Sequence, residues 1–218
     1  MTRPAIGFRY ANPDFRHFCL LRAARIVSDL NGALELTGAG FPQQVGVLHR
    51  TVHEFCSHID LVMAQLDRDG STSGELAEFI ADYFEDSPRG APPAKRKILH
   101  QKYVNELIGA RLDENSSRDR TAAGWKSAAD MHRNVSFVFS NYVHGRYPET
   151  MDLYGGRPGR FHVHGMKGTR KDAENVVMLD ALITTASRCF VGLVQGLKLQ
   201  PLLTSDPMLT EWYRNLGD

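Results

Sequence analysis

The sequence predicts an all-α fold, an antiparallel bundle of about five or six main helices with one long glycine-rich loop. Apolar residues recur at intervals of three and four along most of the chain, which is the period of one buried helical stripe. The alternation of polar and apolar residues that predicts strands is almost absent. Glycine and proline separate the periodic stretches, so we expect consecutive helices to turn back on one another.

The first predicted helix spans residues 14–37 and ends at the glycines that follow. The second spans residues 42–66 and is the most regular in the chain. Its apolar positions alternate strictly between steps of three and four: Val45, Leu48, Val52, Phe55, Ile59, Val62 and Leu66. Because only a short glycine turn separates these two helices, we expect an antiparallel hairpin.

The middle of the chain contains two shorter predicted helices. Thr72 and Glu75 have the spacing of a capping box and begin a short helix that reaches Phe84. Residues 86–94 are the best candidate for an internal linker, within a single domain that covers residues 1–218. A further helix is predicted for residues 93–112, and a final turn or two for residues 208–216.

Two long amphipathic helices flank the glycine-rich loop. The first is predicted for residues 121–144, where Gly145 stops it and Pro148 prevents it from resuming. The second begins after Thr169, whose hydroxyl is expected to cap it while Asp172 reaches back in a capping box.

The loop itself, residues 145–168, is the best candidate for a functional site. Ordered loops longer than about 12–15 residues are uncommon in compact domains and are often functional. Only Glu149 and Asp152 oppose its basic residues, so the chain, at formal net charge +1, keeps a local positive excess here: Arg146, Arg157, Arg160 and Lys167. Backbone amides freed by glycine, beside arginines, suit a phosphate or another anion. A solvated basic loop without a ligand is the alternative.

Three histidines belong to this stretch. His144 ends its helix opposite the apolar stripe and beside Asn141, so it is a candidate general acid or base, or simply a cation that favours the helix dipole. His162 and His164 would point the same way if residues 161–164 form a short strand or ribbon. Two imidazoles need a third ligand to hold zinc, and His144 is the nearest in sequence. Without an H-E-x-x-H or Cys-x-x-Cys pattern, we assign no metal ligand and no cofactor.

Arg50 and Glu54 form a pair four residues apart, on the side of their helix away from its apolar stripe. One interpretation is a surface ion pair of little energetic value. If the helix lies centrally in the bundle, the pair would instead be partly buried and face the loop.

Composition places further limits on function. Near-neutral net charge argues against a general nucleic-acid coat but not against a local binding patch. No continuous apolar run approaches the roughly 20 residues that cross a bilayer, and the N-terminus lacks the apolar core of a signal peptide. The three cysteines are widely separated and have the pattern of small core residues in a reducing compartment. We therefore expect a soluble, cytoplasmic protein that does not associate with membranes.

Three features together resemble a known superfamily: an R-T-V-H-E helix from Arg50 to Glu54, an S-N-Y-V-H-G helix end at residues 140–145, and a long terminal helix. The outline is similar to uncharacterised prokaryotic all-helical families related to HEPN (higher eukaryotes and prokaryotes nucleotide-binding) proteins. This resemblance implies that the protein is a metal-independent endoribonuclease, a toxin or a phage-defence component, and that it acts as a homodimer. It also implies an arginine and a histidine separated by four to six residues, and Arg157 has that spacing to both His162 and His164.

Three functions remain open from the sequence. In a HEPN-like ribonuclease, His144 or His162 would take the proton from a ribose 2′-hydroxyl, while Arg157 or Arg160 stabilises the phosphorane charge. The second is a non-catalytic module that binds an anionic ligand, RNA backbone or a partner protein. The third is a metal-dependent hydrolase built on the three histidines. The expected binding residues are Arg50, Glu54, Asn141, Arg146, His164 and Lys167.

Overall fold

The computed structural model describes residues 10–84, 128–203 and 207, and within them all regular structure is helical apart from one isolated antiparallel bridge. The prediction of an all-α fold is confirmed. Several expectations fall on other residues: the linker at 86–94, the helix at 93–112, the start of the helix at 121–144, and the final turns at 208–216. These lie outside the described residues, so they stay predictions, as does the single domain.

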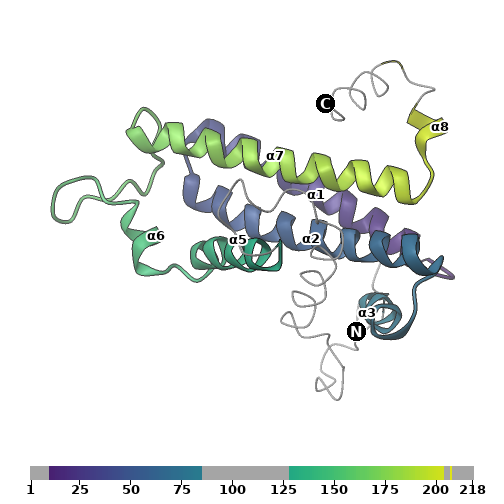
Figure 1. Ribbon diagram of the computed structural model, residues 1–218. Coiled ribbons are helices and arrows are strands. Elements are labelled where there is room, and N and C mark those ends of the chain that lie inside the picture. The colour runs from purple at the N-terminus through teal and green to yellow at the C-terminus, as the bar shows by residue number, and fades with distance from the viewer. Residues whose placement is uncertain (1–9, 85–127, 204–206, 208–218) are drawn as a thin grey trace, which may run out of the picture.

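Helix α2 (Pro42–Asp69) is the centre of the bundle (Figure 1). Helices α1 (Phe15–Ala39) and α7 (Arg170–Gly196) pack beside it and against each other, while α5 (Ala128–Val143) lies against its N-terminal half. The short helix α3 (Gly74–Phe84) packs against α1 near the opposite end of α2. The remaining short helices are α6 (Tyr147–Met151) and α8 (Gln200–Leu203).

The core follows the predicted apolar stripe of α2. Its residues Val45, Val52, Ile59 and Val62 are fully buried. They form one cluster with side chains of α1 and α7, among them Phe18, Ile26, Ala33, Leu179, Leu182 and Ala186. The remaining members of the predicted stripe, Leu48, Phe55 and Leu66, are partly buried at the edge of this cluster. The strict period of α2 therefore reflects its position between α1 and α7.

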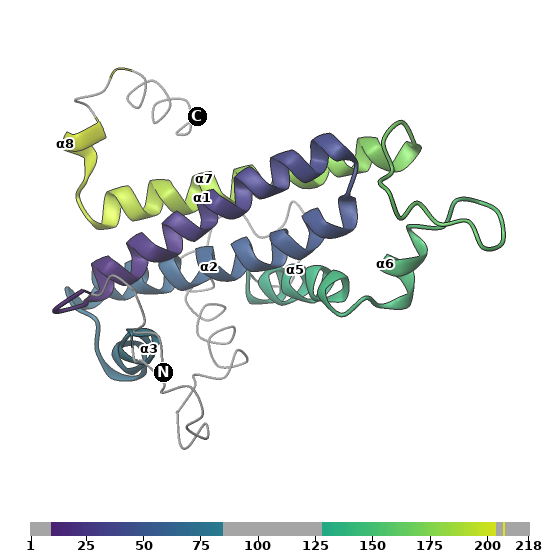
Figure 2. The same cartoon turned by 180° about the vertical axis from the view of Figure 1, so that it is seen from behind.

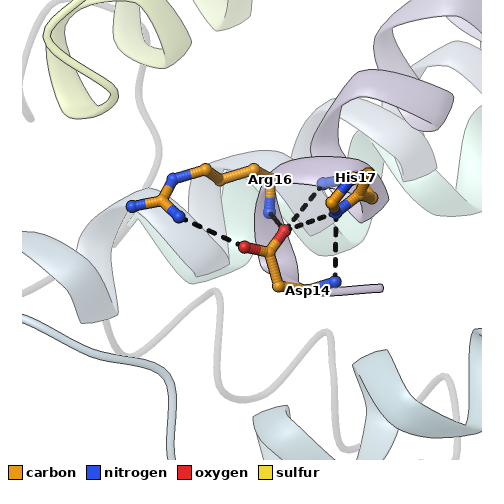
Figure 3. Close-up of polar contacts among 3 residues, drawn as sticks. All are labelled: Asp14, Arg16 and His17. Atoms are coloured by element: carbon orange, nitrogen blue, oxygen red, sulfur yellow. Dashed lines mark hydrogen bonds and ion pairs between the residues drawn. The ribbon is translucent and has the colours of Figure 1, made fainter. Parts of the chain in front are cut away.

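Helix α1 begins where the sequence predicts, because Asp14 caps it (Figure 3). The Asp14 carboxylate accepts hydrogen bonds from the backbone N–H groups of Arg16 and His17, at 2.9 and 3.2 Å. The same carboxylate pairs with the His17 ring at 2.7 Å and with the Arg16 guanidinium at 3.2 Å. These N–H donors hold the pKa of Asp14 below its usual value, although burial acts in the opposite direction. The helix ends at Gly40, whose φ of +81° is the left-handed conformation of a helix C-terminus.

Helix α7 begins after Thr169, as predicted, but its first turn is capped differently. The Thr169 hydroxyl donates backward to the carbonyl of Met166 at 2.7 Å and does not cap the helix. The Asp172 carboxylate accepts the N–H of Gly168 at 3.1 Å. The predicted capping box is therefore wrong in its partners, because both side chains form hydrogen bonds with the backbone of the turn before the helix.

By length and composition, α7 is the one helix of the described part that is apolar enough to cross a bilayer. Core helices of soluble proteins meet the same criterion, so the finding is weak evidence for a membrane. Asp180 and Arg188 interrupt its apolar sequence. Leu179, Leu182 and Ala186 pack into the shared core with α1 and α2.

Candidate functional site

The segment between α5 and α7 is more ordered than a long loop. It contains helix α6 and then a narrow hairpin closed by the bridge between Tyr154 and Phe161. The expectation that Pro148 prevents a new helix is wrong, because Pro148 lies in the first turn of α6. A backbone N–H has no helical partner at that position, so proline is well tolerated there. The Thr150 hydroxyl donates to the carbonyl of Gly145 at 3.0 Å and ties α6 to the end of α5.

Both ends of this segment are fixed to the same end of the bundle, one to the turn between α1 and α2 and the other to the first turn of α2 (Figure 2). The N–H of Met166, a fully buried residue, donates to the carbonyl of Gly40 at 2.6 Å. Gln43 of α2 donates from Nε2 to the carbonyl of Glu149 at 2.5 Å. Gly165 has a φ of +104°, and a Cβ there would lie 2.7 Å from the carbonyl oxygen of Ala39. The basic loop is therefore held on a rigid framework.

The two histidines of the hairpin do not lie in an extended segment. The bridge at Phe161 is followed by a turn at residues 163–164, in which the N–H of Gly165 donates to the carbonyl of His162 at 3.3 Å. The predicted strand over residues 161–164 thus reduces to a single bridge. The expectation that His162 and His164 point the same way, as in a strand, loses its basis. His162 is half-buried and His164 is exposed.

The four basic side chains of the loop are exposed: Arg146, Arg157, Arg160 and Lys167. In the part of the chain that the structure describes, none of them forms an ion pair. The Asp152 carboxylate, one of two acidic groups in the loop, pairs instead with Nζ of Lys171 in α7 at 3.1 Å. The guanidinium of Arg146 lies 5.9 Å from the ring centroid of Phe137. The predicted positive excess is therefore accessible to solvent and largely unneutralised.

His144 and Asn141 lie where α5 ends. His144 is exposed, and its N–H continues the helix to the carbonyl of Ser140 at 3.0 Å. The carbonyl of Asn141, a half-buried residue, accepts the N–H of Arg146 at 3.1 Å. Among residues 10–84 and 128–203, no group of three His, Cys, Asp or Glu side chains is arranged to hold a metal ion. The hydrolase hypothesis, which needs His144 beside both hairpin histidines, gains no support from this geometry.

One predicted arginine and one predicted histidine do come together, at Gly155. A Cβ placed on Gly155 would lie 3.0 Å from Cγ of Arg160 and 3.3 Å from Nε2 of His162. The hairpin hydrogen bonds create this proximity, because the N–H of Gly155 donates to the carbonyl of Arg160 at 2.8 Å and His162 donates to Leu153 at 2.8 Å. For Arg157, the arginine with the HEPN-like spacing, the described residues show no hydrogen bond or ring contact with a histidine.

The Arg50–Glu54 pair is partly buried, as expected for a central helix. Nη1 of Arg50 lies 2.7 Å from Oε2 of Glu54, and the two side chains are 16% and 30% exposed. Its electrostatic neighbours are Arg22 of α1 and His58 of α2. No contact in the described part connects the pair to the loop, so its predicted binding role there is unsupported by the geometry.

Two further polar groups, one buried and one partly exposed, were not among the residues singled out from the sequence. His49 is buried and its ring stacks on Phe139 of α5, with centroids 3.6 Å apart and planes 9° apart. Arg22 places its guanidinium among aromatic rings of α1, α2 and α3. A signal existed for His49, since it lies four residues after Val45 and three before Val52, within the buried stripe.

An open groove borders the loop between the end of α1 and the start of α7. Its walls include Leu34, Thr37, Lys167, Asp172 and Val176, and its volume is about 560 Å³. Lys167 is the link between groove and loop. A ligand held by the loop therefore has a concave surface beside it, with one cation, one carboxylate and apolar side chains.

Comparisons of the chain with family models, with curated proteins and with solved structures find no match.

Proposed function

We propose that this protein binds a phosphate-bearing polyanion, with single-stranded RNA as the ligand class, through the loop at residues 145–168. One observation carries the proposal: four exposed cations, which have no acidic partner within the described ranges, lie on a segment fixed to the bundle by Met166 and Gln43. A rigid framework lowers the entropic cost of ordering the loop when a ligand binds. Each arginine offers a planar fork that matches a phosphate group.

The experiment measures salt dependence. Fluorescence anisotropy of a labelled single-stranded RNA is recorded at salt concentrations between 50 and 200 mM for the wild type and for the Arg157→Ala/Arg160→Ala double variant. Each phosphate contact on a single strand contributes about 0.7 to the slope of log K against log salt concentration. Loss of two contacts should reduce that slope by about 1.4 and weaken binding at low salt.

Arg188→Ala is the matched control, because Arg188 is also exposed but lies 18 residues along α7 from Arg170. That separation is about 27 Å in a helix. The control should bind as the wild type does. Equal losses in both variants would contradict the proposal, because they would show that binding depends on overall charge and not on the loop.

The contact at Gly155 supports a second candidate, a metal-independent endoribonuclease of the HEPN-like kind. In such an enzyme His162 would accept the proton of a ribose 2′-hydroxyl, and the Arg160 guanidinium would stabilise the charge that develops on the phosphorane. Cleavage would proceed in EDTA and be lost in His162→Ala and Arg160→Ala, while His164→Ala retains it. Loss in His144→Ala alone would assign the base to the end of α5.

A Gly155→Ala variant separates binding from catalysis. Its added methyl group would crowd Cγ of Arg160 and Nε2 of His162, so the relative position of these side chains should change. A nuclease that uses this pair should lose cleavage while retaining most of its RNA affinity. If EDTA-resistant cleavage is never observed, the protein is the non-catalytic module of the first proposal.

A further inference from the structure

Arg22 lies at the junction of three helices, and each helix contributes one aromatic ring to its surroundings. The guanidinium carbon is 5.1 Å from the ring centroid of Phe18 in α1, 4.5 Å from that of Phe55 in α2, and 4.6 Å from that of Tyr83 in α3. All three distances lie within the range of cation–π attraction. The rings therefore fix the guanidinium in place without using its N–H groups.

Those N–H groups are the unusual feature. A guanidinium has five hydrogen-bond donors. In the described part of the chain, Arg22 forms no hydrogen bond and no ion pair, and its Nε is buried without a partner. The side chain as a whole is partly exposed, so a ligand has access to its remaining donors. Burial lowers the pKa of Arg22, which shows that its charge lies in an environment poorer than water.

Among the described residues, the carboxylate that interacts with Arg22 does not neutralise it. Glu54 interacts with it electrostatically but is bonded to Arg50, with 2.7 Å between Nη1 and Oε2. His58, on which both arginines act electrostatically, stays uncharged, because burial and the two arginines lower its pKa to about 3. Among the described residues, two guanidinium groups therefore share one carboxylate, which leaves one positive charge in excess.

The neighbouring arginine of α1 shows the ordinary arrangement. Arg25 lies one turn further along the helix, is 59% exposed, and pairs with Asp29 at 2.9 Å. Helix α1 thus supplies the Asp29 carboxylate as the partner of Arg25, an exposed arginine. For Arg22, which is far more enclosed, the described residues supply none.

We propose that Arg22 and Arg50 form a binding site for a small oxyanion, a phosphate or a carboxylate, at the junction of α1, α2 and α3. The guanidinium fork matches both groups in a bidentate geometry. The surrounding rings keep water away and so strengthen the charge interaction. Tyr83, which is 38% exposed, lies at the mouth of the site and offers a hydroxyl to a larger ligand.

This site is separate from the proposed RNA-binding loop. Arg22 and Gly40, where the loop is anchored, are 18 residues apart in the sequence of α1. A helical rise of about 1.5 Å per residue separates them by about 27 Å. The Arg157→Ala/Arg160→Ala double variant should therefore bind the small oxyanion normally, and failure of one proposal leaves the other intact.

The test is thermal melting of the full chain with sodium phosphate, with sodium acetate, and with sodium chloride at matched ionic strength. At a ligand concentration about ten times the dissociation constant, the midpoint should rise by about 3–6 °C over the chloride sample. Arg22→Met should abolish the rise. A rise with only one of the two anions identifies whether the ligand group is a phosphate or a carboxylate.

Arg22→Lys is a second variant that keeps the test valid if Arg22→Met fails to fold. Lysine keeps a cation over the rings but lacks the planar fork of the guanidinium. We expect it to melt near the wild-type temperature in chloride and to bind the oxyanion about tenfold more weakly. Arg25→Lys, one turn away, should bind as the wild type does. An equal rise in wild type and Arg22→Lys, or no rise in the wild type with either anion, would overturn the proposal and leave Arg22 as a cation–π contact between helices.

Discussion

Acidification from pH 7 to pH 5 should destabilise the bundle by about 4 kcal/mol through two buried histidines. His49 and His58 are 3% and 4% exposed. In the described part of the structure, neither ring nitrogen of His49 has a hydrogen-bond partner, and neither has Nδ1 of His58. Burial lowers the pKa of His49 to about 4, and burial together with nearby arginines lowers that of His58 to about 3.

The direction of the effect follows from which state binds the proton. In the unfolded chain both imidazoles take up a proton as the pH falls below about 6.5, whereas the native state excludes it down to the lowered pKa values. Stability is thus complete above the unfolded pKa and is lost as the pH falls from there toward 4. At pH 5 each histidine has cost about 2 kcal/mol relative to pH 7, which is a large part of a typical total of about 5–15 kcal/mol.

Urea denaturation followed by circular dichroism, at pH 7 and at pH 5, measures this loss. His49→Leu removes one titrating ring and should halve the difference between the two pH values, since an apolar side chain of similar size can still pack against Phe139. His164→Ala is the control, because His164 is exposed and its removal should leave the difference unchanged. The reasoning would be refuted if His49→Leu kept the full pH dependence of the wild type.

Glycine substitutions test two close approaches, that of Tyr142 in α5 to Gly46 in α2 and that of Gly165 in the loop to the end of α1. Gly46→Ala should destabilise the protein by about 1–3 kcal/mol in urea denaturation, because its Cβ would lie 2.6 Å from the ring of Tyr142 in α5. Gly192→Ala, whose Cβ meets nothing within 4 Å, should instead be neutral or stabilise α7 by up to about 1 kcal/mol. Gly165→Ala should cost more than Gly159→Ala, because both have positive φ but only Gly165 also faces a carbonyl oxygen at 2.7 Å. Equal effects within either pair would contradict the packing described here.

The long helices were predictable because their apolar residues recur with the period of a helix. The period of α2 is the clearest in the sequence, and α2 is the helix enclosed by α1, α5 and α7. The ends of α1 were predictable for a local reason, since Asp14 and the glycines that follow the helix act on their own backbone neighbours. Periodicity and local capping require no knowledge of the tertiary structure.

The shape of the loop could not be predicted, because distant contacts determine it. The hydrogen bond from Met166 to Gly40 joins residues that are 126 positions apart, and no local sequence pattern predicts it. Pro148 was misjudged for a related reason. Proline stops a preceding helix but is also well tolerated in the first turn of a new one, so the sequence shows a break but not a restart.

The roles of individual side chains were even harder to predict from the sequence. Histidines in the loop were the expected functional ones because they stand among glycines and arginines, yet the histidines whose pKa values are lowered by burial, His49 and His58, lie in α2. Position along a stripe predicts burial, but it does not show whether a polar group in that stripe finds a partner. The surroundings of Arg22 were equally unpredictable, because the three aromatic rings around its guanidinium come from three different helices.

The two proposed anion sites should respond differently to salt, and this difference tests both environments. The loop cations are exposed, so salt screens them and RNA affinity should fall steeply between 50 and 200 mM. Arg22 is enclosed by rings, and charges that are partly buried are screened much less. Oxyanion affinity at Arg22 should therefore fall by no more than a few-fold over the same range. A parallel fall at both sites would mean that water reaches Arg22 as freely as it reaches the loop, and the aromatic enclosure would then contribute little to binding.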